Sequence, residues 1–272
     1  MKVLVTGGNK GIGFGIAQRL IESQRVSHII ITARSEAKAA TAITTLRSQY
    51  DSAPELEYIT LDMLSSSSME QLVVALKERG HVLDAVVHNA GVMFRGGVVN
   101  KEVVDITMNT NYFGPQSLTD LLIKHKRIAS NGRLVFVSSG LGKLARFKNQ
   151  PEILETLSQY KSGDLSVGQL NEIARLYSER VLSLSKGKKW PQSVYAVSKL
   201  LLTVYTYLLA REHGWCRSYS CCPGWCKTDL TEGSKAEKLP YDGADTPVYL
   251  TLEAIPEQLN GEFFEERNVS SI

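Results

Sequence analysis

The sequence predicts a doubly wound α/β fold, in which helices cover both faces of a parallel β-sheet. Short runs rich in β-branched residues alternate with longer segments in which apolar residues recur at helical spacing. The runs are apolar nearly throughout, which is typical of strands buried on both faces of a parallel sheet. We expect about seven strands, and runs are visible at residues 3–6, 28–32, 56–61, 85–88, 133–138 and 218–222.

The segments between these runs are predicted to be helical. The helical spacing is clearest at residues 12–20, 37–46 and 69–76. The alternation stops at about residues 142–190, where Ser166 and Gln169 match a capping box. One helical face there carries Leu170, Ile173, Ala174, Tyr177 and Val181. No linker divides the chain, so we expect one domain over residues 1–272 with a helical insertion.

Composition and charge argue against several classes of protein. The formal net charge is +3, and charged residues are spread without a long run of one sign. Neither a nucleic-acid partner nor a membrane surface is therefore indicated. No apolar run reaches the length of a membrane span, and the start of the chain lacks the pattern of a secretory signal. We expect a cytoplasmic protein.

The four cysteines lie close together in the sequence, as Cys216, Cys221, Cys222 and Cys226. Zinc sites usually draw on spaced pairs, whereas here two cysteines are adjacent in a strand-like run, where successive side chains point in opposite directions. We predict reduced, largely buried thiols and no metal site.

The first turn, TGGNKGIGFG, places Gly7, Gly11 and Gly13 between a strand and a helix. Glycines there let the backbone approach a pyrophosphate, whose charge is stabilised by the N–H groups and dipole of the helix start. A purely structural glycine turn is the alternative. A nucleoside-triphosphate loop is not indicated, because no G-K-[ST] follows.

The second strand run leads into TARS, residues 32–35. An acidic residue here would bind a ribose 2′-hydroxyl, whereas Arg34 would attract a 2′-phosphate. Lys10 could add positive charge at the same end. The pattern favours NADP(H) over NAD(H), unless both residues are ordinary surface cations.

The stretch VYAVSKLLL places Tyr195 four residues before Lys199. On a helix the two side chains share one face and could meet at one ligand. Taken alone, the pair could equally be a packed aromatic beside a solvated charge.

Five motifs follow one another along the chain: TG-x-x-x-G-x-G at 6–13, NAG at 89–91, SS at 138–139, Y-x-x-x-K at 195–199 and PG at 223–224. In this order they resemble the short-chain dehydrogenase/reductase family over essentially the whole chain. The long segment before Tyr195, the sequence CCPGWCKTDL and the ending GEFFEE resemble its monomeric carbonyl reductase branch. The resemblance implies a Rossmann-like fold and reduction of ketones, aldehydes or quinones with NADPH.

The resemblance also implies catalytic roles. Tyr195 would supply the proton, Ser139 would bind the substrate oxygen, and Lys199 would hold the nicotinamide ribose and lower the pKa of Tyr195. Asn111 would position a water in the proton relay. Asn109 and Ser138 are the alternatives for Asn111 and Ser139.

The same resemblance implies the contacts of the cofactor. They are Gly7, Asn9, Lys10, Gly11, Ile12, Gly13, Arg34, Asp62, Met63, Asn89, Ala90, Gly91, Tyr195, Lys199, Pro223, Gly224, Trp225 and Thr228. Trp225 would also form a wall of the substrate site beside Ser139 and Tyr195, with core packing as its alternative. Two residues depart from the family pattern: His88, interpreted as a strand-end group, and Cys226, whose thiol could make the enzyme sensitive to alkylation.

The insertion is expected to cover the helix surface through which many relatives pair, so we predict a monomer. The family resemblance implies that it acts on small carbonyl compounds. Two other functions remain open. One is an alcohol or hydroxysteroid dehydrogenase working in the oxidative direction, and the other is a non-catalytic NADP(H)-sensing protein.

Overall fold

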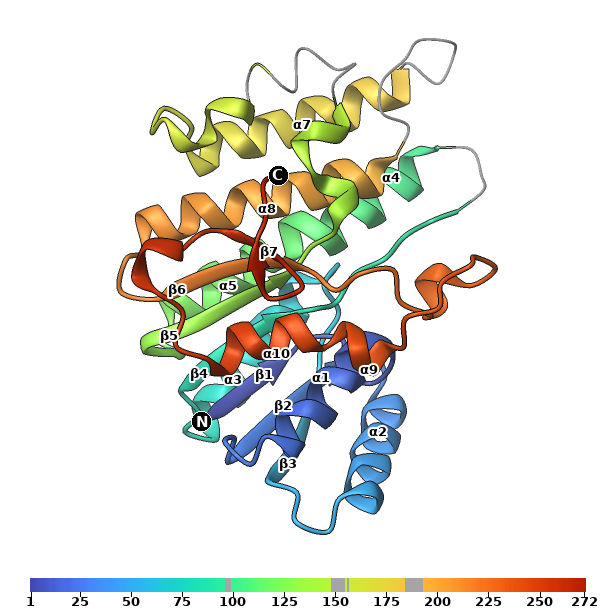
Figure 1. Ribbon diagram of the computed structural model, residues 1–272, viewed down its shortest axis with the longest axis vertical. Coiled ribbons are helices and arrows are strands. Elements are labelled where there is room, and N and C mark those ends of the chain that lie inside the picture. Colours follow the sequence, from blue (N-terminus) through green and yellow to red (C-terminus); the bar gives the residue numbers. More distant parts are fainter. Residues whose placement is uncertain (96–98, 148–154, 156, 184–192) are drawn as a thin grey trace.

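Figure 1 shows the computed structural model, which describes residues 1–95, 99–147, 155, 157–183 and 193–272. An eight-stranded sheet has the strand order β3-β2-β1-β4-β5-β6-β7-β8. The neighbouring strands from β3 to β7 pair in parallel, and β8 pairs antiparallel with β7. The strands are β1 (Lys2–Val5), β2 (His28–Ala33), β3 (Glu55–Thr60), β4 (Leu83–His88), β5 (Ile128–Val137), β6 (Arg217–Cys222), β7 (Phe263–Glu265) and β8 (Asn268–Val269).

This sheet confirms the doubly wound fold. The chain runs outward from β1 through β2 to β3, then returns to the other side of β1 as β4. The six strand runs visible in the sequence correspond to β1 to β6. The sequence shows no run at β7 or β8, because strands of three and two residues are too short to display a period.

Helices cover both faces of the sheet. One face carries α1 (Gly11–Glu22), α2 (Glu36–Gln49) and α10 (Asp245–Leu252), and α9 (Pro240–Gly243) packs on α1. The other face carries α3 (Ser66–Glu78), α4 (Lys101–Met108), α5 (Gly114–Lys124) and α8 (Val194–Glu212). Short 3-10 helices are η2 (Gly140–Gly142), η3 (Leu144–Phe147), η4 (Ser158–Lys161), η5 (Asp229–Thr231) and η6 (Glu257–Leu259). Among the described residues, no helix is both long and apolar enough to cross a bilayer.

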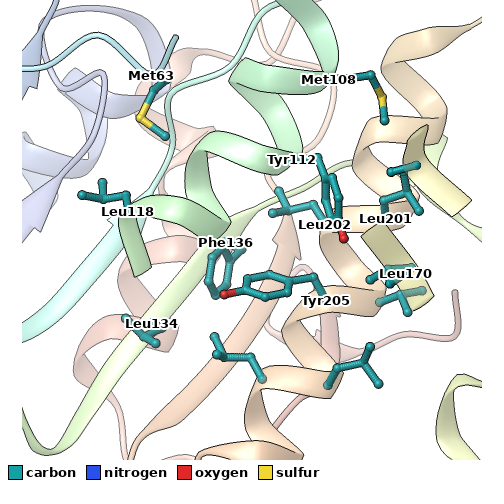
Figure 2. Close-up of a cluster of buried hydrophobic side chains, with 14 of the residues drawn as sticks. Met63, Met108, Tyr112, Leu118, Leu134, Phe136, Leu170, Leu201, Leu202 and Tyr205 are labelled. Atoms are coloured by element: carbon teal, nitrogen blue, oxygen red, sulfur yellow. The ribbon is translucent and has the colours of Figure 1, made fainter. Parts of the chain in front are cut away.

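Alternation along each strand divides the core between these two layers. In β1, Leu4 packs on the side of α3 and α8, whereas Val3 and Val5 pack on the side of α1 and α2. Figure 2 shows part of the first cluster, in which the rings of Phe136 and Tyr205 meet edge to face with centroids 5.7 Å apart. This packing fixes α8 against β5 and so positions the residues that α8 carries.

The helical insertion contributes α7 (Val167–Ser183), which lies against α8 (Figure 1). Ser166 and Gln169 form both hydrogen bonds of the predicted capping box, with lengths of 3.2 and 2.9 Å. Of the predicted helical face, Leu170, Ala174, Tyr177 and Val181 are buried and Ile173 is partly buried. The remaining parts of the expected insertion, residues 148–154, 156 and 184–190, lie outside the described residues.

Candidate active site

A cleft of about 270 Å³ lies at the carboxyl ends of the parallel strands. Predicted site residues that line it are Gly7, Asn9, Lys10, Gly11, Ile12, Arg34, Asp62, Met63, Asn89, Ala90, Gly91, Tyr195, Lys199, Pro223 and Thr228. Gly13, Asn111, Ser139, Gly224 and Trp225 are not among its lining residues. This is the edge of a doubly wound sheet at which ligands bind.

The glycine turn after β1 needs its glycines. Gly7 and Gly11 have φ angles of 64° and 55°, in the left-handed region that favours glycine. A Cβ on Gly13 would collide with the Gly7 carbonyl, so Gly13 supports the turn although it does not line the cleft. Lys10, the N-cap of α1, makes no side-chain capping bond, so the first N–H groups of the helix are not used by it. They can bind an anion.

Asn89 holds the glycine turn against the end of β4. Its Nδ2 donates to the carbonyls of Thr6 and Gly7, at 3.0 and 3.2 Å. The Thr6 hydroxyl oxygen accepts hydrogen bonds from the backbone N–H groups of Asn89 and Ala90, both at 3.0 Å. Thr6 was not singled out in the sequence, although it opens the first motif.

Cationic side chains gather at the end of the cleft next to β2. Arg34 is exposed there and forms no salt bridge within the described part of the chain. Lys38, one turn into α2, also lines the cleft. Sequence reasoning missed Lys38, because Arg34 precedes α2 and helical spacing does not relate the two positions. Lys10 instead pairs with Asp229 across the cleft and lowers the pKa of that carboxyl, so its charge is partly neutralised.

Other lining residues were not among the predicted site residues, although several lie inside the quoted motifs and Ser138 was the alternative to Ser139. They are Thr32, Ala33, Ser35, Leu61, Leu64, Val92, Ile106, Thr110, Val137, Ser138, Asp229 and Leu230. The predicted adenine contact, Asp62, is held in place by its neighbours: its Oδ1 accepts from the Leu64 N–H and its own N–H donates to Ser68 Oγ, both at 3.0 Å.

Tyr195 and Lys199 lie on α8 as predicted, and Lys199 is not a solvated charge. It is only 4% exposed, and its Nζ donates to the Val137 carbonyl at 2.7 Å and lies 5.8 Å from the centroid of the Tyr195 ring. Burial lowers the pKa of Lys199 to about 8.

The pKa of Tyr195 is shifted in the direction opposite to the one expected from the sequence. Burial raises it to about 12, and this effect exceeds that of a hydrogen bond with Ser139, which acts in the opposite direction. The sequence argument considered only the charge of Lys199, and burial of the phenol was not visible in it.

The two serines after β5 are distinguished by their partners. Ser138 is buried and donates to the Lys199 carbonyl at 2.9 Å, with Thr203 Oγ1 2.7 Å away. Ser139 contacts Tyr195 and accepts a hydrogen bond from the Leu141 N–H at 3.2 Å. Ser139 therefore lies next to Tyr195, whereas Ser138 joins β5 to the backbone of α8.

We expect Ser139→Ala to lower kcat by about a hundredfold, because it removes the proposed donor for the reacting oxygen, and to cost only about 0.5 kcal/mol of stability through the lost hydrogen bond with Leu141. Ser138→Ala should instead lower the free energy of unfolding by about 1 kcal/mol and leave kcat within a few-fold of wild type, because it removes a buried hydrogen bond. Steady-state kinetics and thermal melting of both variants test this assignment. Equal losses of kcat would contradict it.

Asn111 lies in a π-helical turn, η1 (Asn109–Phe113), between α4 and α5. It is fully buried, and its side chain is fixed by the Val92 N–H and carbonyl at 2.8 and 2.9 Å and by Ser198 Oγ at 3.1 Å. A Cβ on Gly91 would lie 3.3 Å from Asn111 Oδ1 and 3.5 Å from Lys199 Nζ, so both side chains face the same point.

The alternative residue, Asn109, faces outward. It is exposed, and its side chain donates to the Asp105 carbonyl at 2.8 Å. The extra residue in the turn separates the two asparagines in this way, and π-helical turns of this kind are frequent at functional sites.

In the loop after β6, Cys226 is buried, contrary to the expectation of a reactive thiol, and Trp225 is exposed. Cys226 is 2% exposed and burial raises its thiol pKa to about 11, so the structure gives no basis for sensitivity to alkylation. Trp225 is 44% exposed, with the Arg95 guanidinium 4.9 Å above its ring. Core packing is thus excluded for Trp225, which stays available to a substrate. All four cysteines are free thiols.

His88 is a buried strand-end residue, as interpreted from the sequence. Its ring stacks on Phe136 and its Nε2 lies 3.0 Å from Thr119 Oγ1. Burial lowers its pKa to about 3, so the imidazole is neutral at physiological pH.

Comparison with known proteins places this site in a family. A family model described as short chain dehydrogenase matches residues 1–151. Carbonyl reductase (NADPH) 1 of Mus musculus is 34% identical over 285 residues, which cover 98% of this chain and 96% of the relative.

Solved structures share the fold. Salutaridine reductase of Papaver somniferum aligns with a TM-score of 0.83 at 24% identity, covering 97% of this chain and 99% of that one. An NADPH-bound carbonyl reductase from chicken fatty liver aligns with a TM-score of 0.72 at 20% identity, covering 100% and 98% of the two chains. At these identities the two structures support the fold alone.

Proposed function

The chain belongs to the short-chain dehydrogenase family, and on this premise we propose that it is a carbonyl reductase that transfers hydride from NADPH to ketones, aldehydes or quinones. One observation carries the proposal. Tyr195 contacts Ser139 and lies beside the buried ammonium group of Lys199, at the edge of a cleft that begins at a glycine turn. The relatives named carbonyl reductase over nearly the whole chain support the same reaction.

The residues of the cleft fit NADPH. The turn at Gly7 and Gly11 leaves room for a pyrophosphate at the start of α1. Arg34 and Lys38 would bind the 2′-phosphate through charge-assisted hydrogen bonds. When it is bound, NADPH supplies the hydride.

The protein side chains supply the proton and hold the substrate oxygen. As the carbonyl carbon accepts hydride, its oxygen gains negative charge, and the Tyr195 hydroxyl donates its proton to that oxygen. Ser139 donates a hydrogen bond to the same oxygen. Lys199 stabilises the Tyr195 phenolate that remains. Asn111 would hold a water molecule that returns a proton to this phenolate.

The test follows the loss of reduced-nicotinamide absorbance with NADPH and then NADH, against a quinone, an aromatic aldehyde and an aliphatic ketone. We expect turnover with NADPH and at least one of these compounds. Tight binding of NADPH without turnover of any of them would instead favour the non-catalytic sensing protein.

Replacing Arg34 with aspartate should raise KM for NADPH by about 10- to 100-fold and leave KM for NADH unchanged or lower. A carboxylate at the end of β2 repels a 2′-phosphate and can accept a hydrogen bond from a ribose 2′-hydroxyl. Steady-state kinetics with both cofactors measure the change. Lys77→Asp, an exposed cation on α3, is the matched control, and an equal loss with NADPH and NADH in the Arg34 variant would refute the assignment.

We further propose that the protein works in the cytoplasm as a monomer. The free thiols suit a reducing compartment. Helix α8 is buried almost all round, with α7 packed against it, so it offers little surface to a second copy. Sedimentation velocity at micromolar concentration should give the mass of a single chain, and a stable dimer would reject this part of the proposal.

A further inference from the structure

Two histidines and a glutamate lie together at the amino-terminal edge of the sheet, opposite the cleft. His28 begins β2, Glu57 lies in β3, and His81 lies in the turn between α3 and β4. Five residue steps separate His28 from Ala33 at the cleft end of β2, which at about 3.3 Å each is roughly 17 Å. The cluster is therefore distinct from the candidate active site.

The candidate ligand atoms converge on one point. The Nε2 atoms of His28 and His81 lie 3.0 and 2.9 Å from the same oxygen, Glu57 Oε2, and the three groups offer atoms within 4.8 Å of one another. Ligand atoms bound to a tetrahedral Zn²⁺ at 2.0–2.1 Å are about 3.3 Å apart. Only a small outward movement would therefore admit the ion.

Burial holds these side chains in place while leaving an approach from solvent. The side chains of His28 and His81 are 3% and 9% accessible, and that of Glu57 is 19% accessible. Imidazole is the commonest metal ligand among side chains.

We propose that His28, Glu57 and His81 bind one Zn²⁺ ion, with water completing a four-coordinate site. Two imidazoles and one carboxylate form a donor set that suits zinc. The ion would join β2, β3 and the turn before β4 at an edge of the sheet. Because the cluster touches no part of the cleft, the ion would stabilise the fold and take no part in the reaction.

One neighbouring carboxylate favours binding of the ion, and two neighbouring cations weaken it. Glu55 Oε2 lies 3.4 Å from His28 Nδ1, where it can accept a hydrogen bond from the Nδ1–H group when Nε2 binds the metal. Lys2 Nζ lies 3.2 Å from His81 Nδ1, and Arg79 pairs with Glu57. Both cations repel a dication, so Lys2 and Arg79 must turn away, and removing the charge of Lys2 should tighten binding.

The test is a titration of the chelator-treated full chain with Zn²⁺ by calorimetry, with Co²⁺ absorption and thermal melting as further readouts. The variants are His81→Gln, Glu57→Gln and Lys2→Gln, with the exposed His125→Gln as control. We expect one Zn²⁺ per chain and a Tm increase of roughly 5–10 °C at a free concentration about 100 times Kd. Binding should be lost in the first two variants, tighter in Lys2→Gln and unchanged in the control.

Three results would overturn the proposal: no binding at a large excess of Zn²⁺, equal binding by wild type and Glu57→Gln, or a Co²⁺ spectrum with intense thiolate charge-transfer bands, which would place the ion on cysteine. Glu57→Gln keeps the size of the side chain and decides the matter if His81→Gln does not fold. Circular dichroism of each metal-free variant establishes that it is folded.

Discussion

Replacing Tyr195 with phenylalanine is expected to lower kcat by about a hundredfold to ten-thousandfold while leaving NADPH binding intact. The substitution removes only the hydroxyl group, so the ring still packs on α8 and beside Lys199. What is lost is the proton donor to the substrate oxygen, together with its hydrogen bond to Ser139. Hydride transfer would then leave an unprotonated alkoxide in a buried site, which is unfavourable.

The measurement for Tyr195 separates chemistry from binding. Single-turnover kinetics give the rate of the chemical step, and nicotinamide fluorescence gives the dissociation constant of NADPH. Tyr207→Phe is the matched control, because Tyr207 lies on the same helix and its ring packs on Tyr160 rather than in the cleft. A Tyr195 variant that keeps wild-type kcat would remove tyrosine from the proposed role and leave Ser139 as the next candidate.

The sequence predicts where the cleft lies because the chemistry follows the ends of the strands. Four of the five motifs come directly after a run that the structure shows as a strand, and parallel strands bring those ends to one edge. The fifth motif, Y-x-x-x-K, lies on α8, the helix on which the family resemblance placed it. These features depend on residues close together in the chain.

The choice between neighbouring residues needed the fold. Ser138 and Ser139 are equivalent in the sequence, and only the position of α8 shows that Ser138 bonds to its backbone. Asn109 and Asn111 are separated by a π-helical turn that hydrophobic spacing does not reveal. The ion pair of Lys10 could not be predicted either, because its partner, Asp229, lies 219 positions further along the chain.

The histidine cluster shows the same limit more sharply. His28, Glu57 and His81 are separated by 29 and 24 positions and match no metal-ligand spacing. The pairing of β2 with β3 and the turn before β4 bring them together. A search of the sequence for closely spaced ligands therefore examines the cysteines and misses this site.

Lys199 should make carbonyl reduction depend on pH, with a rate that is flat below about pH 8 and falls above it. Burial lowers the pKa of Lys199 to about 8, so its ammonium loses its proton in this range. The pKa of Tyr195, about 12, keeps the proton donor protonated throughout. The fall at high pH therefore reports loss of the positive charge that stabilises the phenolate formed when Tyr195 gives up its proton.

Replacing Lys199 with methionine should lower kcat by about a hundredfold below pH 8 and abolish the fall above it. A unit charge about 6 Å from the phenolate is worth roughly 3 kcal/mol at an effective dielectric constant near 20, which corresponds to that factor. Methionine fills a similar volume in the buried position, so the fold should persist. The pH dependence of kcat in the wild type and in Lys199→Met measures the effect, with the exposed Lys124→Met as control. If the variant retained the wild-type fall near pH 8, another group would be titrating, and the role of Lys199 would be confined to binding the cofactor.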